Sequence, residues 1–383
     1  MRATGGSPVP KETIRNLARQ AGFPFVGFAA AGVSARATDL ERWLAAGYHG
    51  ELAWLARRVP ERQDPRRLLP GTRTVLLLGV PHEPGDPDGR PEPPPPPGWG
   101  RVARFARSRD YHRVLAPRLK ELGRELARLL PGVSSRGECD TGAVLERAWA
   151  QEAGLGFVGW HAGLIVPAAG SWVTLAAVLL DRELPPDGPD AASCAACGEC
   201  LTRCPTGALQ APGIVDARRC IAYLTIEARG PIPRAWRAAL GWRLFGCDAC
   251  QEGCPHNRAP APADPELAAL PGRRDLELGR VLRLGSEEEL LAWLPGSPVR
   301  RPKLAGLKRN ACLVLGNGPP GVALPELIDR LQGDESPMVR GAAAWALGRM
   351  GERPGRQALA RALDTETEPG VRQEILAARE RRP

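Results

Sequence analysis

The sequence predicts an α+β domain, followed by a small metal-binding domain and a C-terminal stack of helices. Three observations support this fold class. Helix-like and strand-like segments mix without strict alternation early in the chain, eight of the ten cysteines lie within 61 residues, and a short motif recurs at intervals of 31 and 32 residues near the end. With 383 residues, 43% apolar and 25% charged, the chain can form two or three globular domains.

The first 100 residues predict two helices, one strand and one long loop. Apolar residues recur with helical spacing in residues 11–21 and 37–58, and residues 74–80 (TVLLLGV) have the composition of a buried strand. Residues 81–97 contain nine prolines, which cannot donate backbone hydrogen bonds, so we expect an extended loop there.

The next 80 residues continue the mixture of helix and strand. Residues 110–130 predict a helix with a leucine stripe, residues 144–153 a second helix, and residues 172–180 (WVTLAAVLL) a buried strand. The leucines of the stripe are Leu115, Leu119, Leu122, Leu126 and Leu129.

The cysteine-rich segment has the spacing of bacterial ferredoxins. Residues 194–205 read C-x2-C-x2-C-x3-C-P, and residues 247–255 read C-x2-C-x3-C-P, with Cys220 between them. In ferredoxins of this type three thiolates bind one [4Fe–4S] cluster and the fourth binds the other. Two such clusters need eight thiolates, which is the number present in this segment.

The ferredoxin crossover predicts two ligand sets. The first cluster would take Cys194, Cys197, Cys200 and Cys254, and the second Cys204, Cys220, Cys247 and Cys250. Two alternatives remain for this segment, which are zinc ribbons built from C-x2-C pairs and a disulfide scaffold.

The C-terminal region carries an internal repeat. Arg309, Arg340 and Arg372 occupy equivalent positions in three similar segments, and a Leu-Gly pair follows the first two, at residues 315–316 and 347–348. A period near 30 in an Ala- and Leu-rich helical region predicts a short solenoid similar to HEAT repeats.

The net charge of +9 favours an anionic partner. Residues 101–136 hold ten basic and three acidic residues, and a second basic run consists of Arg300, Arg301, Lys303, Lys308 and Arg309. Contact with nucleic-acid phosphates is one interpretation, and a solvated surface is the other. Since no apolar run is long enough to span a membrane and residues 1–11 lack export features, we expect a cytoplasmic protein.

Several ordered motifs resemble the epoxyqueuosine reductase family. They are CDTGAVLERAWA at residues 139–150, AGLGFVG at 153–159, GSW at 170–172, YLTIE at 223–227 and FGCDACQ at 245–251. The resemblance covers roughly residues 10–383. It implies a cobalamin-dependent iron–sulfur enzyme that reduces epoxyqueuosine to queuosine at the wobble position of tRNA, the last step of queuosine biosynthesis. It also implies a monomer that takes electrons from an external donor.

The resemblance assigns a role to Asp140, which matches the family's proton donor. A carboxyl group that protonates the opening epoxide oxygen needs a raised pKa, and burial beside the corrin would raise the pKa of Asp140. The alternative is that Asp140 caps the helix that starts near Ala143.

The same resemblance implies further contacts. Cobalamin would also be bound by Ser171, Trp172, Thr225, Asp248 and Ala249, and Arg229 would contact tRNA. Trp160-His161 depart from the Lys-Asn pair expected after Gly159.

The expected organisation is an α+β cobalamin-binding catalytic domain at residues 1–190 and a bacterial-ferredoxin-like two-cluster domain at 191–262. A linker with helices at 263–305 and HEAT-like repeats at 306–383 follow. Two alternative functions remain: a reductive-dehalogenase-like cobalamin and iron–sulfur reductase of a small molecule, and a ferredoxin-type electron-transfer protein.

Overall fold

The N-terminal part is built on a four-stranded antiparallel sheet. The computed structural model describes residues 10–380. Every neighbouring pair in the sheet is antiparallel, and the strand order is β1-β2-β7-β4. The strands are β1 (Phe25–Ala30), β2 (Thr74–Pro81), β7 (Val173–Leu180) and β4 (Ser135–Glu138). Strand β2 is buried along its whole length, as its apolar sequence predicts.

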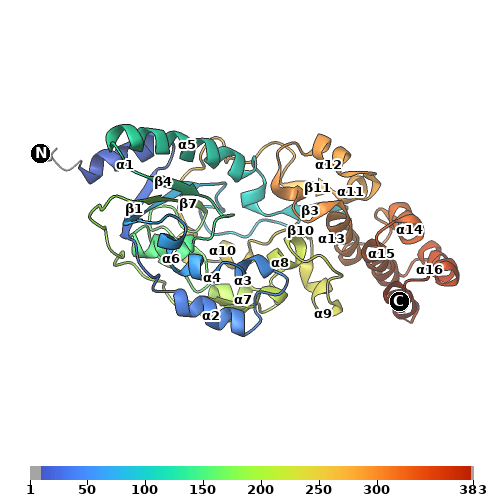
Figure 1. The fold of residues 1–383 in the computed structure, drawn as a ribbon. Helices are drawn as coiled ribbons and strands as arrows, with labels where there is room; N and C mark the ends of the chain where they lie inside the picture. The colour runs from blue at the N-terminus through green and yellow to red at the C-terminus, as the bar shows by residue number, and fades with distance from the viewer. Residues whose placement is uncertain (1–9, 381–383) are drawn as a thin grey trace, which may run out of the picture.

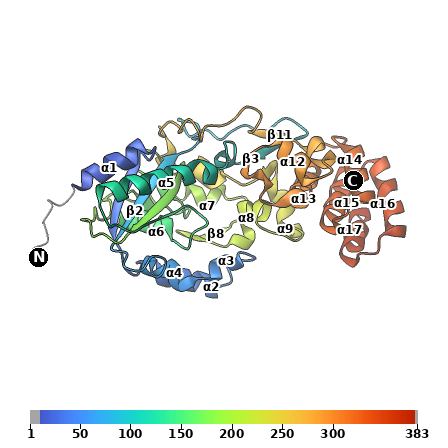
Figure 2. The ribbon, with the colours of Figure 1, turned by 45° about the horizontal axis from the view of Figure 1, so that its top comes forward.

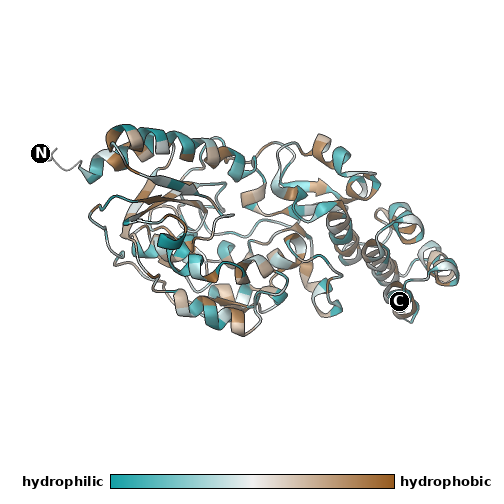
Figure 3. Ribbon diagram, viewed as in Figure 1, coloured by the Kyte–Doolittle hydropathy of each residue, from teal (hydrophilic) through white to brown (hydrophobic). Residues whose placement is uncertain are grey.

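Helices cover both faces of this sheet. α1 (Lys11–Gln20) and α5 (Tyr111–Leu129) share a core with Leu76 and Leu78 of β2, whereas α6 (Glu146–Glu152) packs in the core that holds Val75 and Leu77. The alternation along β2 therefore divides its side chains between two cores. Figure 3 shows that α1 and α5 carry both hydrophilic and hydrophobic residues, which is typical of helices with one buried face.

The prediction of one helix over residues 37–58 is wrong. Two helices occur there, α2 (Ala37–Ala45) and α3 (Ala53–Ala56), and α4 (Val59–Gln63) follows directly. Gly47 and Gly50 interrupt the pattern with positive φ angles of 66° and 55°. A Cβ atom at Gly50 would lie 2.7 Å from the Tyr223 hydroxyl, so this turn needs glycine to approach the cysteine-rich region.

The cysteine-rich region consists of short elements joined by turns. They are α7 (Glu199–Arg203), β8 (Leu209–Ala211), β9 (Ile214–Val215), α8 (Ile221–Ile226), α9 (Arg234–Arg237), β10 (Arg243–Phe245) and α10 (Ala249–Glu252). The hairpin of β5 (Phe157–Val158) and β6 (Leu164–Ile165) belongs to the N-terminal part. β3 (Trp99–Val102) pairs with β10 in parallel and with β11 (Asp275–Glu277) in antiparallel orientation. This small sheet joins three distant parts of the chain.

The C-terminal region is helical. The predicted linker holds α11 (Leu278–Arg283) and α12 (Glu287–Trp293), and the predicted repeat holds α13 (Lys303–Asn317), α14 (Leu324–Gly333), α15 (Pro337–Met350), α16 (Arg353–Thr365) and α17 (Pro369–Arg379). α15 packs between α13 and α17. The glycines of the repeated Leu-Gly pairs allow this packing, because a Cβ at Gly316 would lie 2.9 Å from Ala346 Cα and one at Gly348 would lie 2.8 Å from Ala378 Cα.

The molecule is elongated, with the N-terminal sheet at one end and the repeats at the other (Figures 1 and 2). One continuous hydrophobic core runs from Val102 through α8 and β10 into α13, α15 and α17. The repeats are therefore packed onto the cysteine-rich region. Within residues 10–380, no helix is both long and apolar enough to cross a membrane.

Candidate redox centre

Four cysteines line one small cavity. Cys194, Cys197 and Cys200 share it with Cys254, which lies 54 positions further along the chain. Burial raises the pKa of Cys254, and the charges of the three other thiols raise it further. The predicted first ligand set is thus brought together by the fold, although its fourth member is remote in sequence.

The other four cysteines form a second group. Burial raises the pKa of Cys250 well above its ordinary value, and the charges of Cys247, Cys220 and Cys204 add to this effect. Burial also raises the pKa of Cys247 to about 12. Four thiolates this close together in a buried site would repel one another, so they need bound metal to remain ionised.

The arrangement of the cysteines does not match the disulfide alternative for this segment. All ten cysteines are free thiols, which is against a disulfide scaffold. The eight thiols of this segment instead fall into the two groups of four that the ferredoxin spacing predicts.

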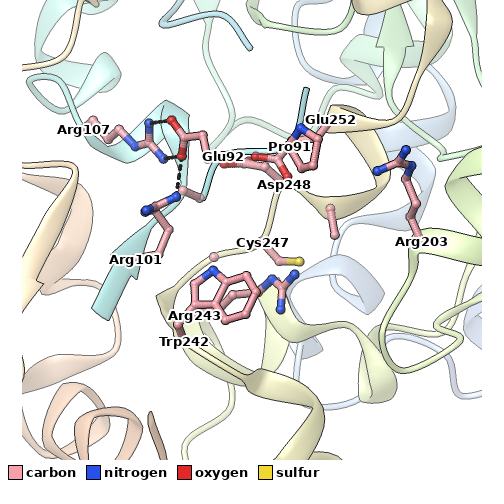
Figure 4. Close-up of a pocket in the computed structure, with 13 residues that line it drawn as sticks. Pro91, Glu92, Arg101, Arg107, Arg203, Trp242, Arg243, Cys247, Asp248 and Glu252 are labelled. Atoms are coloured by element: carbon pink, nitrogen blue, oxygen red, sulfur yellow. Dashed lines mark hydrogen bonds and ion pairs between the residues drawn. The ribbon is translucent and has the colours of Figure 1, made fainter. Parts of the chain in front are cut away.

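A cavity of about 210 Å³ lies beside the second cysteine group (Figure 4). Cys247, Asp248 and Ala249 line it, together with Arg107 and Glu92. Burial raises the pKa of Asp248 to about 6. Two of the residues predicted to bind cobalamin, Asp248 and Ala249, are therefore adjacent to a cluster cysteine.

Glu92 is a site residue that the sequence did not single out. It lies in the proline-rich loop, and its carboxylate accepts hydrogen bonds of 2.8 and 2.7 Å from Arg107 and one of 2.7 Å from Arg101 (Figure 4). Burial would raise the pKa of Glu92, but these arginines outweigh it and lower that pKa to about 2. The available signal was an acidic residue in a loop next to a strongly basic segment.

Three arginines of the basic segment at residues 101–136 are structural, and for these three the interpretation as phosphate contacts is wrong. Arg101, Arg104 and Arg107 are at most 9% exposed in their side chains. Each forms an ion pair with Glu92. The three arginines thus hold the proline-rich loop against the cysteine-rich region.

Ser171 and Trp172 lie directly before β7. The Ser171 hydroxyl donates to Gln251 and accepts from Asn257, each at 2.9 Å, which connects the sheet to the cysteine-rich region. Trp172 is 1% exposed, and the Arg104 guanidinium lies over its ring at 5.4 Å. The indole N–H of Trp172 has no hydrogen-bond partner among residues 10–380.

Thr225 is fully buried and already hydrogen-bonded. Its hydroxyl donates to the Ile221 carbonyl at 2.7 Å and accepts from the Gly246 amide at 2.9 Å. Thr225 therefore fixes the backbone that leads into Cys247, and its contact with a cofactor remains a prediction.

Asp140 lies apart from the cavity, in a group with Tyr111 and His112. The Tyr111 hydroxyl donates to Asp140 Oδ2 at 2.9 Å, and His112 Nε2 is 3.3 Å from the same oxygen, which is ion-pair distance without hydrogen-bond geometry. The other ring nitrogen of His112 is 2.8 Å from Asp110. Asp140 has a φ of 57°, and the N-cap of α6 is Leu145, so Asp140 does not cap that helix.

The protein's own residues do not raise the pKa of Asp140. Its side chain is 57% exposed. Partial desolvation raises its pKa, but the interactions with His112 and Tyr111 outweigh this effect and hold the pKa below its ordinary value. The proton is held on His112 instead, because the interactions with Asp110 and then Asp140 raise the pKa of His112 to about 9.

The second basic run divides into exposed and buried residues. Arg300, Arg301 and Lys303 are exposed, whereas Lys308 and Arg309 are buried. Lys308 pairs with Asp334, and Arg309 donates to the carbonyls of Leu224, Ala228 and Gly230. The interpretation of these two residues as nucleic-acid contacts is therefore wrong.

Arg229, the predicted tRNA contact, is 46% exposed in its side chain. Its guanidinium donates to the Arg301 carbonyl at 2.9 Å. Arg301 in turn forms two 3.0 Å hydrogen bonds with Glu227, and its charge acts on Asp140. The start of the repeats and the helix after Cys220 therefore meet near the Asp140 group.

The fold and the two cysteine groups define an iron–sulfur redox protein with attached helical repeats. Three family models match in this order: "Epoxyqueuosine reductase QueG, DUF1730" at residues 62–141, "4Fe-4S double cluster binding domain" at 193–257, and "HEAT repeats" at 305–379. The double-cluster match agrees with the predicted pair of [4Fe–4S] clusters.

Relatives identify the family. An epoxyqueuosine reductase of Xanthomonas campestris is 38% identical over 349 residues, covering 88% of this chain and 95% of that protein. One of Pseudomonas aeruginosa is 37% identical, covering 89% and 94%. The chain belongs to the epoxyqueuosine reductase family and is an oxidoreductase. The matches do not support the alternatives of a small-molecule reductase or an electron-transfer ferredoxin.

Solved structures agree with this assignment. A crystal structure of epoxyqueuosine reductase with an epoxyqueuosine-modified tRNA-Tyr stem loop has a TM-score of 0.88 and 30% identity, covering 97% of this chain and 98% of that one. The Bacillus subtilis enzyme with its catalytic aspartate loop swung out of the active site has a TM-score of 0.87 and 29% identity, with the same coverage.

Proposed function

We propose that this chain reduces the epoxide of epoxyqueuosine in tRNA to the alkene of queuosine, with two [4Fe–4S] clusters and cobalamin. The balanced reaction consumes the epoxide, two electrons and two protons, and yields the alkene and water. The observation that carries this proposal is the combination, in one family member, of two four-cysteine groups with an aspartate that is paired to a protonated histidine.

The two clusters would carry the electrons one at a time from an external donor. Cluster 1 is held by Cys194, Cys197, Cys200 and Cys254, and cluster 2 by Cys204, Cys220, Cys247 and Cys250. Cys197 is exposed, whereas Cys247 lines the cavity that also holds Asp248. We therefore order the path from the donor to cluster 1, then to cluster 2 and the cofactor.

Buried polar atoms without partners support a cobalamin site near Trp172. Within residues 10–380, Trp172 Nε1, Arg104 Nε and Glu83 Oε2 are buried and make no hydrogen bond. These donors and acceptors suit the amide side chains of the corrin. Ser171, Trp172, Asp248 and Ala249 would line the site, with Thr225 behind them. When bound, cobalamin would supply a cobalt centre that transfers both electrons to the epoxide carbon.

Asp140 and His112 would supply the proton to the epoxide oxygen. An alkoxide is a poor leaving group until it is protonated, so a positioned acid lowers the barrier. Asp140 is ionised in the free protein, and His112 next to it holds a proton at neutral pH. We infer that the proton passes from His112 Nε2 through Asp140 Oδ2, the atom that also accepts from Tyr111.

The tRNA would bind across the junction of the ferredoxin-like domain and the repeats. Arg229, Arg300 and Lys303 are exposed basic residues at this junction, and Arg301 beside them interacts electrostatically with Asp140. The tRNA stem loop bound to the relative supports this partner.

We propose that the chain has four domains, at residues 1–190, 191–262, 263–305 and 306–383, and that the protein is a monomer.

The test is the tRNA of a strain that lacks this chain. Mass spectrometry of its nucleosides should show epoxyqueuosine in place of queuosine, and the native gene should restore queuosine. Unchanged queuosine in the deletion strain would overturn the proposed function. Purified protein should also contain about eight irons per chain and bind cobalamin.

A further inference from the structure

His161 lies in a tight hairpin that reaches the first cysteine group. The hairpin joins β5 to β6, and Phe157 and Ile165 from its two strands form a small core with Cys254, against which Cys194 packs. His161 is 7% exposed and lines the same cavity as the four cysteines. An element of the N-terminal domain is thus placed directly beside cluster 1.

The backbone fixes which ring nitrogen of His161 carries the proton. The Gly163 amide donates to His161 Nδ1 at 3.0 Å, so Nδ1 is an acceptor and the neutral ring has its proton on Nε2. Gly163 is needed for this contact, because a Cβ there would lie 2.8 Å from Nδ1.

The Nε2–H of His161 is a buried donor without an acceptor. It makes no hydrogen bond among residues 10–380. A buried unpaired N–H costs about 1–3 kcal/mol, so native structures rarely retain one without a function. The other histidine in this cavity differs, because His256 Nε2 already accepts from the Ala195 amide at 3.3 Å.

We propose that His161 Nε2–H donates a hydrogen bond to a sulfur of the cluster held by Cys194, Cys197, Cys200 and Cys254, and so raises the reduction potential of cluster 1. This inference rests on the proposed cluster assignment. Reduction makes the cluster more negative, so a fixed donor stabilises the reduced form more than the oxidised form. Cluster 1 would then accept electrons from a weaker donor than it otherwise could.

The experiment is a redox titration of the complete holoprotein, followed by electron paramagnetic resonance. His161→Phe removes the donor, His161→Gln keeps an N–H donor, and Trp160→Phe alters another residue of the same cavity. The midpoint potential of cluster 1 should fall in His161→Phe and stay near native in the other two. Cluster 2 in the same sample is the internal reference.

Two results would overturn the proposal. One is an unchanged cluster 1 potential in His161→Phe, and the other is an equal fall in His161→Phe and His161→Gln, which would assign the effect to packing. If His161→Phe cannot hold its cluster, the hydrogen bond is tested in the native protein instead. With ¹⁵N-labelled histidine, the reduced cluster should show a ¹⁵N hyperfine coupling, and its absence would refute the hydrogen bond.

The experiment distinguishes a failure of the proposed function from a failure of this inference. If the native protein lacks about eight irons or the signals of two clusters, the cluster assignment itself is wrong. If both clusters are present and the potential does not depend on His161, only the hydrogen bond is wrong.

Discussion

Asp140 combines a strained backbone with a carboxylate that has two polar partners. A φ of 57° is unfavourable for aspartate and is retained where surrounding contacts compensate for it. Here the contacts are the Tyr111 hydroxyl, His112 and the Glu146 carboxyl, which accepts from the Asp140 amide at 3.0 Å. This geometry holds the carboxylate in one position, which is what proton transfer to a bound substrate requires.

Replacement of Asp140 by asparagine tests its role. Asp140→Asn keeps the size of the side chain and removes the group that can be protonated, so single-turnover conversion should slow by about 10²- to 10⁴-fold. Iron content and tRNA affinity should match the native protein. A rate within a few-fold of native would contradict the assignment.

The charge of His112 predicts a pH dependence of stability. The folded-state pKa of about 9 lies above the ordinary 6.5, so the contribution of His112 is fully present below pH 6.5 and is lost as the pH rises through about 9. The Tm difference between the native protein and His112→Gln should therefore shrink between pH 6.5 and pH 9.5. A difference that grows over this range would refute the ion pair.

At the scale of elements, two glycines of the repeat region differ in the space around them. A Cβ at Gly348 would lie 2.6 Å from Ala378 Cβ, whereas one at Gly370 in α17 would meet nothing within 4 Å. Gly348→Ala should lower the free energy of unfolding by about 1–3 kcal/mol through overpacking. Gly370→Ala should be neutral or slightly stabilising, because it only restricts the unfolded chain. Denaturant unfolding of both variants measures this, and equal effects would contradict the packing.

The elements also show how far the sequence could be interpreted. The apolar runs at 74–80 and 172–180 became β2 and β7, and the leucine stripe at 110–130 became α5, since each has a single strong period. Residues 37–58 kept a helical period across Gly47 and Gly50, but the approach of Tyr223 breaks the helix there. The two glycines are a local signal for the break, but the contact with Tyr223 is remote in sequence and no local pattern predicts it.

The site was also predictable only in part. Cysteine spacing predicted the two groups of cysteines that the fold brings together, and their binding of clusters stays a prediction. The pKa of Asp140 was not predictable, since it depends on His112 and Tyr111, which lie 28 and 29 positions away. The count of basic residues also could not predict that Arg107 and Arg309 are buried. Arg107 pairs with the proline-rich loop, and Arg309 donates to backbone carbonyls across a domain junction.

At the scale of the whole molecule, the repeats and the redox domains share one core. Arg309 crosses their junction by donating to three carbonyls, and the exposed Arg229, Arg300 and Lys303 lie on the surface of that junction. The repeats would therefore extend the surface that faces the tRNA.

This surface predicts a salt-dependent affinity for tRNA. Removing one basic side chain that binds a phosphate should reduce the slope of log K against log salt by about 0.7–0.9. Arg300→Ala and Lys303→Ala should each lower the affinity and the slope, measured by filter binding across salt concentrations. Arg73→Ala, an exposed arginine that pairs with Glu183, is the control and should leave both unchanged. Affinity that hardly varies with salt would contradict the proposed tRNA surface.

The most direct measurement is conversion of the substrate by the purified protein. The protein, with its clusters intact and cobalamin and a low-potential reductant added, is incubated with tRNA that carries epoxyqueuosine, and the nucleosides are analysed by mass spectrometry. We predict a loss of one oxygen from the modified base, giving queuosine, with no conversion when cobalamin is omitted. Unchanged epoxyqueuosine in the complete mixture would contradict the account.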